Sequence, residues 1–120
     1  MIIAQLSDTH IRLPGKLAYR RVDTAKYLAA AVAHVNALDP APDLVLMTGD
    51  LVDFALPGEY EHLAALIAPL RAPVFLVPGN HDDRDPMRQG FPAHTYLPRT
   101  GRLNYTIEDR PLRIVALDTL

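Results

Sequence analysis

Seven polar side chains suited to metal binding or to acid–base catalysis fall into three short blocks of the sequence. They are Asp8 and His10, then Asp50 and Asp53, then Asn80, His81 and Asp82. Carboxylate, imidazole and amide donors without sulfur suit Mn, Fe, Zn or Co better than copper, and the chain has no cysteine. Two such ions about 3.5 to 4 Å apart would activate a water and hold the attacking and leaving oxygens of a displacement at phosphorus. The pattern therefore favours phosphoester hydrolysis with two divalent metal ions.

The spacing of these residues predicts a role for each metal ligand. Asp8 and His10 are two positions apart, so in an extended segment both side chains would face the same way and could hold one cation. Asp50 follows Gly49, whose small size lets the backbone approach closely, and the two carboxylate oxygens of Asp50 could bridge two metals. The amide oxygen of Asn80 is a further hard ligand.

His81 is predicted to point past the metals toward the substrate. There it could donate to a phosphoryl oxygen or protonate the leaving group. A carboxylate from Asp53 or Asp82 could hold its ring in the productive tautomer. We favour Asp53 in this role, because Asp82 is also a candidate cap for the following segment.

Each polar block follows a short apolar run that predicts a strand, and two amphipathic segments lie between these strands. The expected strands are Ile2–Leu6, Leu44–Met47 and Val74–Val77, and the expected helices run from Asp23 or Thr24 to Leu38 and from Pro57 to Leu70. Alternation of strand and helix predicts right-handed crossovers and an α/β fold whose parallel sheet is flanked by helices. Ile2–Leu6 reads as a strand covered on both faces. The three blocks would then meet at the carboxyl edge of this sheet, where open α/β sheets build their sites.

The last third of the chain predicts a short helix over residues 83–90 and an antiparallel hairpin. The hairpin strands are Leu103–Ile107 and Leu112–Leu117. The last strand ends at Asp118 without a covering helix, so we expect either that the chain is part of something longer or that a partner covers it, as in a homo-oligomer. Arg84 is a candidate phosphate contact, with a solvated arginine as the alternative reading.

Composition narrows the class of partner. The chain has 120 residues, of which 49% are hydrophobic and 22% charged, as in an ordinary globular domain. Its formal net charge of -2 gives no basic footprint for a nucleic acid polymer or an anionic membrane. No stretch approaches the roughly 18 apolar residues of a membrane span, so a cytoplasmic protein is expected.

The three blocks together resemble the first three signature blocks of the calcineurin-like metallophosphoesterases. These are Asp8-Thr9-His10, Gly49-Asp50-Leu51-Val52-Asp53 and Gly79-Asn80-His81-Asp82, and the likeness covers residues 1 to about 85. The chain is most similar to the bacterial branch that holds cyclic-nucleotide phosphodiesterases and glycerophosphodiesterases. The resemblance implies a β-sandwich flanked by helices. It also implies that Asp8 and His10 bind the first metal, Asp50 bridges, Asn80 binds the second, and His81 contacts the phosphate.

One departure from the family pattern leaves two hypotheses open. The family completes its metal sites with a later Gly-His block and a Gly-His-x-His block, and this chain has neither. His34, His62 and His94 are poor substitutes, since two fall in helical stretches and one in a proline-flanked loop. We therefore expect residues 1–120 to be the N-terminal part of a single metallophosphoesterase domain, truncated after the strand ending at Asp118. One hypothesis is a phosphodiesterase that uses a metal-activated hydroxide, and the other is a catalytically incomplete fragment acting only as a metal-binding or self-associating module.

Overall fold

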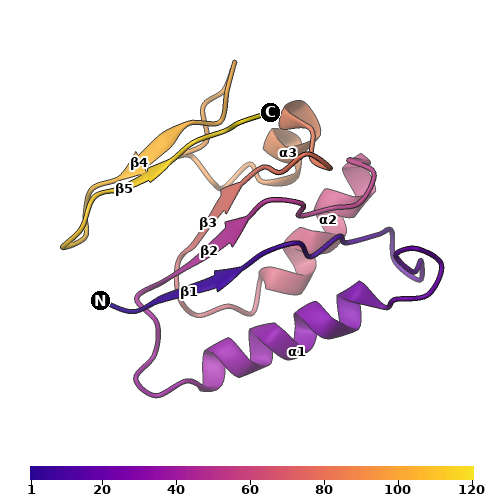
Figure 1. Cartoon of the computed structure of the whole chain (residues 1–120), viewed down its shortest axis with the longest axis horizontal. Coiled ribbons are helices and arrows are strands. Elements are labelled where there is room, and N and C mark those ends of the chain that lie inside the picture. The colour runs from indigo at the N-terminus through magenta and orange to yellow at the C-terminus, as the bar shows by residue number, and fades with distance from the viewer.

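A three-stranded parallel sheet is the layer that positions the site, in a computed structural model that describes residues 1–120 (Figure 1). Its strands are β1 (Ile3–Leu6), β2 (Leu44–Thr48) and β3 (Val74–Val77), in the order β1-β2-β3. The helices α1 (Thr24–Ala37) and α2 (Pro57–Ile67) make the two crossovers. Two right-handed crossovers in the same direction put both helices on one face of the sheet, where they pack side by side. The predicted α/β class is confirmed.

Burial alternates along the sheet and differs from the prediction for the first strand. Val45 and Met47 of β2 and Leu76 of β3 are fully buried beneath the helices. β1 is instead an edge strand in which Ile3 and Gln5 are exposed while their neighbours are half-buried. The expectation that this strand is covered on both faces is therefore wrong for this chain, because both crossover helices lie on the same side.

The helices begin where the sequence predicts but end slightly earlier. Asp23 caps α1, and its carboxylate accepts a hydrogen bond of 3.1 Å from Lys26 N. α2 starts at Pro57, where the missing N–H of proline costs no hydrogen bond. It ends at Ile67 rather than Leu70. The short helix α3 (Arg84–Gly90) is capped by Asp83, so the role of cap considered for Asp82 falls to the next residue.

A two-stranded antiparallel sheet, β4 (Tyr105–Ile107) and β5 (Ile114–Ala116), lies beyond β3, as predicted for the hairpin. Its contact with β3 is made by tyrosine side chains, not by strand pairing. Leu76 N donates to Tyr96 Oη at 2.9 Å, and Tyr105 Oη donates to Leu76 O at 2.8 Å. Both rings also pack near Phe75, that of Tyr105 stacked and that of Tyr96 tilted. Phenol hydroxyls therefore satisfy the outward backbone groups that an edge strand would leave open.

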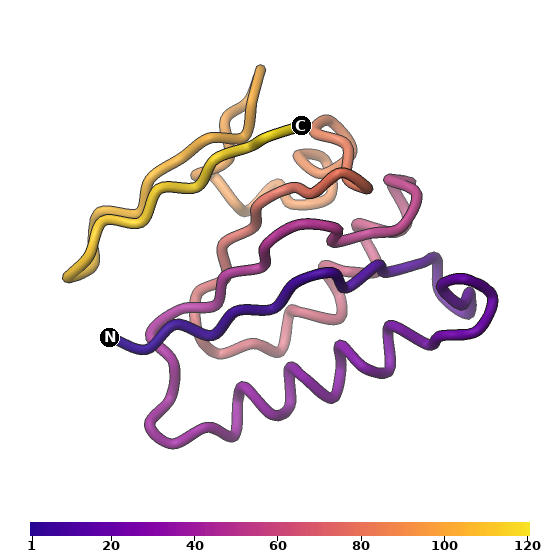
Figure 2. The backbone as a smooth tube through the Cα atoms, viewed as in Figure 1, coloured from indigo at the N-terminus to yellow at the C-terminus, as the bar shows by residue number.

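Asp118 joins the end of the hairpin to α3. Its buried carboxylate receives Arg84 Nε at 2.6 Å, Arg84 Nη2 at 3.0 Å and the backbone N–H of Leu103 at 2.7 Å. The Arg84 side chain, 29% exposed, is therefore held in an ion pair and is not the freely solvated arginine that the sequence suggested. Figure 2 shows the C-terminus beside α3 and the N-terminus at the far end of the sheet. None of the helices is both long and apolar enough to cross a membrane.

The Arg84–Asp118 pair predicts a loss of stability in acid. Hydrogen bonds from Arg84 lower the pKa of Asp118 from 3.8 to about 2. A carboxyl group with a depressed folded-state pKa stabilises the fold above its unfolded pKa, and this contribution disappears as pH falls through the folded pKa. The difference in unfolding free energy between the wild type and Asp118→Asn (the stability gap), measured with urea, should therefore be constant above about pH 5 and shrink toward pH 2.

Asp109→Asn is the matched control for this measurement. The Asp109 side chain is 75% exposed, and its ion pair with Arg110 is 3.6 Å long. Its stability gap should be small at every pH, because exposed pairs contribute little. A gap for Asp118→Asn that does not change between pH 5 and pH 2 would contradict the role given to this pair.

Candidate metal centre

The three sequence blocks meet at the carboxyl edge of the parallel sheet, around one open cavity of about 320 Å³. Asp8 follows β1, Asp50 follows β2 and Asn80 follows β3, and all three line this cavity. The other lining residues are Thr48, Gly49, Val77, Pro78, Gly79, Leu117 and Thr119. The predicted convergence of side chains far apart in the sequence is thus present.

Two overlapping groups of donor atoms lie at this edge. Asp8, His10 and Asp50 each offer one donor, and these atoms lie within 4.8 Å of one another. His10, Asp53 and His81 form a second such group. Two carboxylates and an imidazole are a donor set that manganese, iron, zinc and cobalt all accept. The first group therefore fits a divalent cation by both chemistry and spacing.

Left-handed backbone, not an extended segment, brings the first group together. φ is 54° at Asp8, 41° at His10 and 48° at Asp50, a region that residues other than glycine rarely adopt. Hydrogen bonds between the two loops hold this conformation: Asp8 N donates to Gly49 O at 3.0 Å, and His10 N donates to Asp50 O at 2.9 Å. The expectation that Asp8 and His10 share a face of an extended strand is wrong, although both side chains do join one cluster. Backbone strain of this kind concentrates at functional sites.

Two glycines allow the loop after β2 to touch the loop after β3. A Cβ on Gly79 would lie 2.2 Å from Asp50 N and 2.4 Å from Asp50 Oδ1. A Cβ on Gly49 would lie 3.1 Å from the Cα of Gly79, and its φ is +81°. Asp50 therefore sits against bare backbone, where His81 N donates to Asp50 Oδ1 at 3.0 Å. Its other oxygen, Oδ2, lies 3.8 Å from Nε2 of His10.

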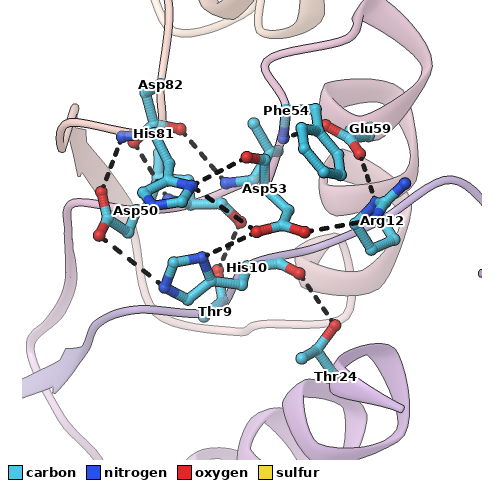
Figure 3. Close-up of polar contacts among 12 residues, drawn as sticks. Thr9, His10, Arg12, Thr24, Asp50, Asp53, Phe54, Glu59, His81 and Asp82 are labelled. Carbon is cyan, nitrogen blue, oxygen red and sulfur yellow. Dashed lines mark hydrogen bonds and ion pairs between the residues drawn. The ribbon is translucent and has the colours of Figure 1, made fainter. Parts of the chain in front are cut away.

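Asp53 lies near both histidine rings through its carboxylate, and its carbonyl oxygen makes a further contact with His81 (Figure 3). Its carbonyl oxygen lies 2.9 Å from Nδ1 of His81, and because a carbonyl can only accept, Nδ1 of His81 carries the proton. Its carboxylate Oδ1 lies 3.4 Å from Nδ1 of His10 and 3.6 Å from Nδ1 of His81. The sequence suggested that this carboxylate orients His81. In the structure the hydrogen bond to His81 comes from the backbone, and the carboxylate lies closer to His10.

The environment of His81 favours its protonated form. The hydrogen bond to the Asp53 carbonyl raises the pKa of His81, and the nearby carboxylates of Asp50, Asp53 and Asp82 add to this effect. The ring meets that of His10 edge-on, with centroids 4.8 Å apart. With Nδ1 bound to the carbonyl, Nε2 is the nitrogen left for another partner.

Asp82 ties the two loops together from beneath the site. Its buried carboxylate accepts hydrogen bonds from Gly79 N at 2.8 Å, Leu51 N at 3.1 Å and Val52 N at 3.2 Å. Tyr60 Oη of α2 lies 3.3 Å away. Burial raises the pKa of Asp82, although these hydrogen bonds oppose the rise. Asp82 is therefore a buried link between loops, and it contacts neither histidine ring by a hydrogen bond.

Two residues beside the site were not predicted from the sequence. Arg12 lies between Asp53 and Glu59, and the Glu59 side chain is fully buried. Glu59 reads in the sequence as an acidic residue in the first turn of a helix, which is usually exposed. Arg12 follows His10 by two positions in a loop, and no local pattern marks it.

Comparison with known proteins places these residues in a family context. A family model described as calcineurin-like phosphoesterase matches residues 1–116. A probable glycerophosphodiester phosphodiesterase, GpdQ, of Arcobacter nitrofigilis is 40% identical over 99% of this chain and 44% of its own length. A cAMP/cGMP dual specificity phosphodiesterase of Mycobacterium tuberculosis is 32% identical over 98% of this chain and 38% of its own length.

A third relative matches a smaller part of the chain. The 3',5'-cyclic adenosine monophosphate phosphodiesterase CpdA of Pseudomonas aeruginosa is 36% identical over 74% of this chain and 33% of its own length. The chain therefore spans less than half the length of the curated relatives described here.

The contact between the two glycines predicts that Gly79→Ala disrupts the metal cluster. The added methyl would meet Asp50 N at 2.2 Å, so the loop carrying Asp50 must move. We expect Mn²⁺ affinity, measured by calorimetry, to fall at least 10-fold. Gly101→Ala is the matched control, because Gly101 has a φ of +69° but nothing within 4 Å of its Cβ position. It should cost about 1 to 2 kcal/mol of stability and leave Mn²⁺ affinity unchanged. Equal affinity in the wild type and Gly79→Ala would show that the contact does not position Asp50.

Proposed function

The chain belongs to the calcineurin-like phosphoesterase family, and on that premise we propose that it supplies the first part of a metal-dependent phosphodiesterase site. The observation that carries the proposal is the convergence of Asp8, His10, Asp50 and Asn80 at one edge of the sheet. The relatives support it, since they are named as glycerophosphodiester and cyclic nucleotide phosphodiesterases.

We assign the metal ligands as follows. Asp8 and His10 would hold a first divalent ion, Asp50 would contribute to both sites, and Asn80 would bind the second. Manganese, iron, zinc and cobalt all suit this donor set. Divalent cations at such a site lower the pKa of bound water and neutralise charge on the phosphoryl oxygens. The hydrogen bond from His81 N fixes Asp50 Oδ1, and Asp50 Oδ2 is directed to the side of His10.

His81 is the proposed proton donor. Its Nδ1 is bound to the Asp53 carbonyl, which leaves Nε2 to face the substrate. The hydrogen bond to the Asp53 carbonyl and the carboxylates around it raise its pKa, which favours a second proton on Nε2. That proton would go to a phosphoryl oxygen or to the departing alkoxide as the P–O bond breaks.

The proposed substrate is a small phosphodiester, either a glycerophosphodiester or a 3',5'-cyclic nucleotide. We further propose that residues 1–120 are the N-terminal part of one metallophosphoesterase domain. The coverage of 44% of the GpdQ relative supports this, because more than half of that protein has no counterpart here. The histidine ligands absent from this chain would then come from outside these residues. Self-association stays a prediction from the sequence.

Turnover of bis(p-nitrophenyl) phosphate with added Mn²⁺ or Co²⁺ tests the proposed function. It should be measured for this chain and for a version extended to the length of its relatives. We expect hydrolysis by the extended protein and little by residues 1–120, because the chain carries only part of the ligand set. Turnover by neither protein, with both folded and metal-loaded, would remove the proposal. It would leave the reading of a metal-binding or self-associating module.

Asn80→Ala and His81→Ala should separate the two proposed roles in the extended protein. Asn80 is exposed at the cavity, so its loss removes a ligand without opening a core cavity, and we expect metal content and kcat to fall together. His81→Ala should retain both metals and lower kcat by about 10²- to 10⁴-fold. Full metal occupancy in Asn80→Ala, measured by elemental analysis, would contradict the assignment of Asn80 as a ligand.

A further inference from the structure

We infer that Arg12 is a positioning residue that holds the Asp53 carboxylate against His10, so that Nε2 of His10 is left free for a metal ion. The inference rests on the proposed function, because it concerns how one of the proposed ligands is prepared. It adds two residues, Arg12 and Glu59, that lie outside the three sequence blocks.

The guanidinium of Arg12 is held on three sides. Its Nε donates to Glu59 Oε1 at 2.9 Å, and its Nη1 lies 3.3 Å from Asp53 Oδ2. Its Cζ lies 4.1 Å from the centre of the Phe54 ring, within the range of a cation–π contact. The two carboxylate side chains are only 6% and 0% exposed, so water screens these pairs weakly.

The Glu59 side chain and the backbone of Arg12 are both held at α2. Glu59 Oε2 accepts hydrogen bonds from Phe54 N at 2.9 Å and Leu56 N at 3.3 Å, where the chain enters the helix. His62, one turn further along α2, places Nδ1 2.7 Å from the carbonyl oxygen of Arg12. The guanidinium is therefore positioned by Glu59 of α2 and by the residues that lead into this helix.

The consequence reaches His10 through Asp53. Nδ1 of His10 is buried and has no hydrogen-bond partner, and the Asp53 oxygen that Arg12 does not contact lies 3.4 Å from it. A carboxylate only accepts, so closing this gap requires the proton of His10 to reside on Nδ1. The lone pair of His10 is then on Nε2, on the side of Asp50, which is the arrangement seen when a carboxylate orients a metal-binding histidine.

Removing Arg12 would leave Asp53 and Glu59 as two buried carboxylates without a shared cation. An unpaired buried charge is unfavourable, so the Asp53 side chain would rotate toward water. This rotation withdraws the acceptor from Nδ1 of His10. A purely structural ion pair would lower stability when broken and would leave the His10 ring unaffected. The two roles therefore differ in a measurable way.

The imidazole ¹⁵N shifts of His10 report its tautomer directly and can be recorded without metal, at a pH where the ring is neutral. We expect the wild type to hold the proton on Nδ1 and Arg12→Met to give a mixture of both tautomers. Zn²⁺ affinity by calorimetry should fall about 10-fold in Arg12→Met, the lower end of the effect of residues that orient metal ligands. Arg12→Lys, which keeps the charge, should recover part of both signals.

Arg113→Met is the matched control, because Arg113 pairs with Glu108 on the hairpin with its side chain 69% exposed. It should change neither the tautomer nor the affinity. An unchanged His10 tautomer and Zn²⁺ affinity in folded Arg12→Met would overturn the inference. Should Arg12→Met fail to fold, Glu59→Gln replaces it. The amide oxygen can still accept from Phe54 N, but the neutral side chain no longer forms an ion pair with Arg12.

This experiment also separates the inference from the proposed function. Failure of the wild type to bind Zn²⁺ would count against the proposed metal site alone, because the His10 tautomer is measured without Zn²⁺. If the wild type and Arg12→Met bind Zn²⁺ equally tightly and have the same His10 tautomer, the result would count only against the positioning role of Arg12.

Discussion

The contact between the loop after β2 and the loop after β3 is the constraint on which the site depends. Two glycines remove the side chains that would separate the loops, and the buried Asp82 carboxylate joins them by accepting backbone hydrogen bonds from both. Together they hold the Asp50 carboxylate against bare backbone, where the loop after β3 supplies a hydrogen bond from His81 N. The position of the Asp50 carboxylate thus depends on glycine at positions 49 and 79.

Asp53 shows how one residue can serve two rings without a conflict. Its carbonyl can only be an acceptor for His81, which leaves its carboxylate free to lie between His10 and Arg12. One position in the chain therefore contacts the rings of both His10 and His81.

The fold and the convergence at the sheet edge could be predicted from the sequence because they follow from periodicity and from the geometry of parallel strands. Apolar runs ending in Asp8, Asp50 and Asn80 imply one carboxyl edge whatever the details of the loops. The left-handed backbone at Asp8 and His10 could not be predicted, because it accompanies hydrogen bonds to the second loop, whose partners lie about 40 residues further along the chain. The Arg12–Glu59 pair escaped prediction for a related reason. Its partners are 47 residues apart, and burial of Glu59 depends on how α2 meets the loop.

The tyrosines beside β3 have a consequence for how the sheet can grow. Leu76 has both of its outward backbone groups taken by phenol hydroxyls, so no further strand can pair with β3 at that position. β1, at the other end of the strand order, keeps its outer side open. Pairing with an added strand is therefore blocked at Leu76 and open at β1, where a parallel strand would bring its carboxyl end next to Asp8 and His10.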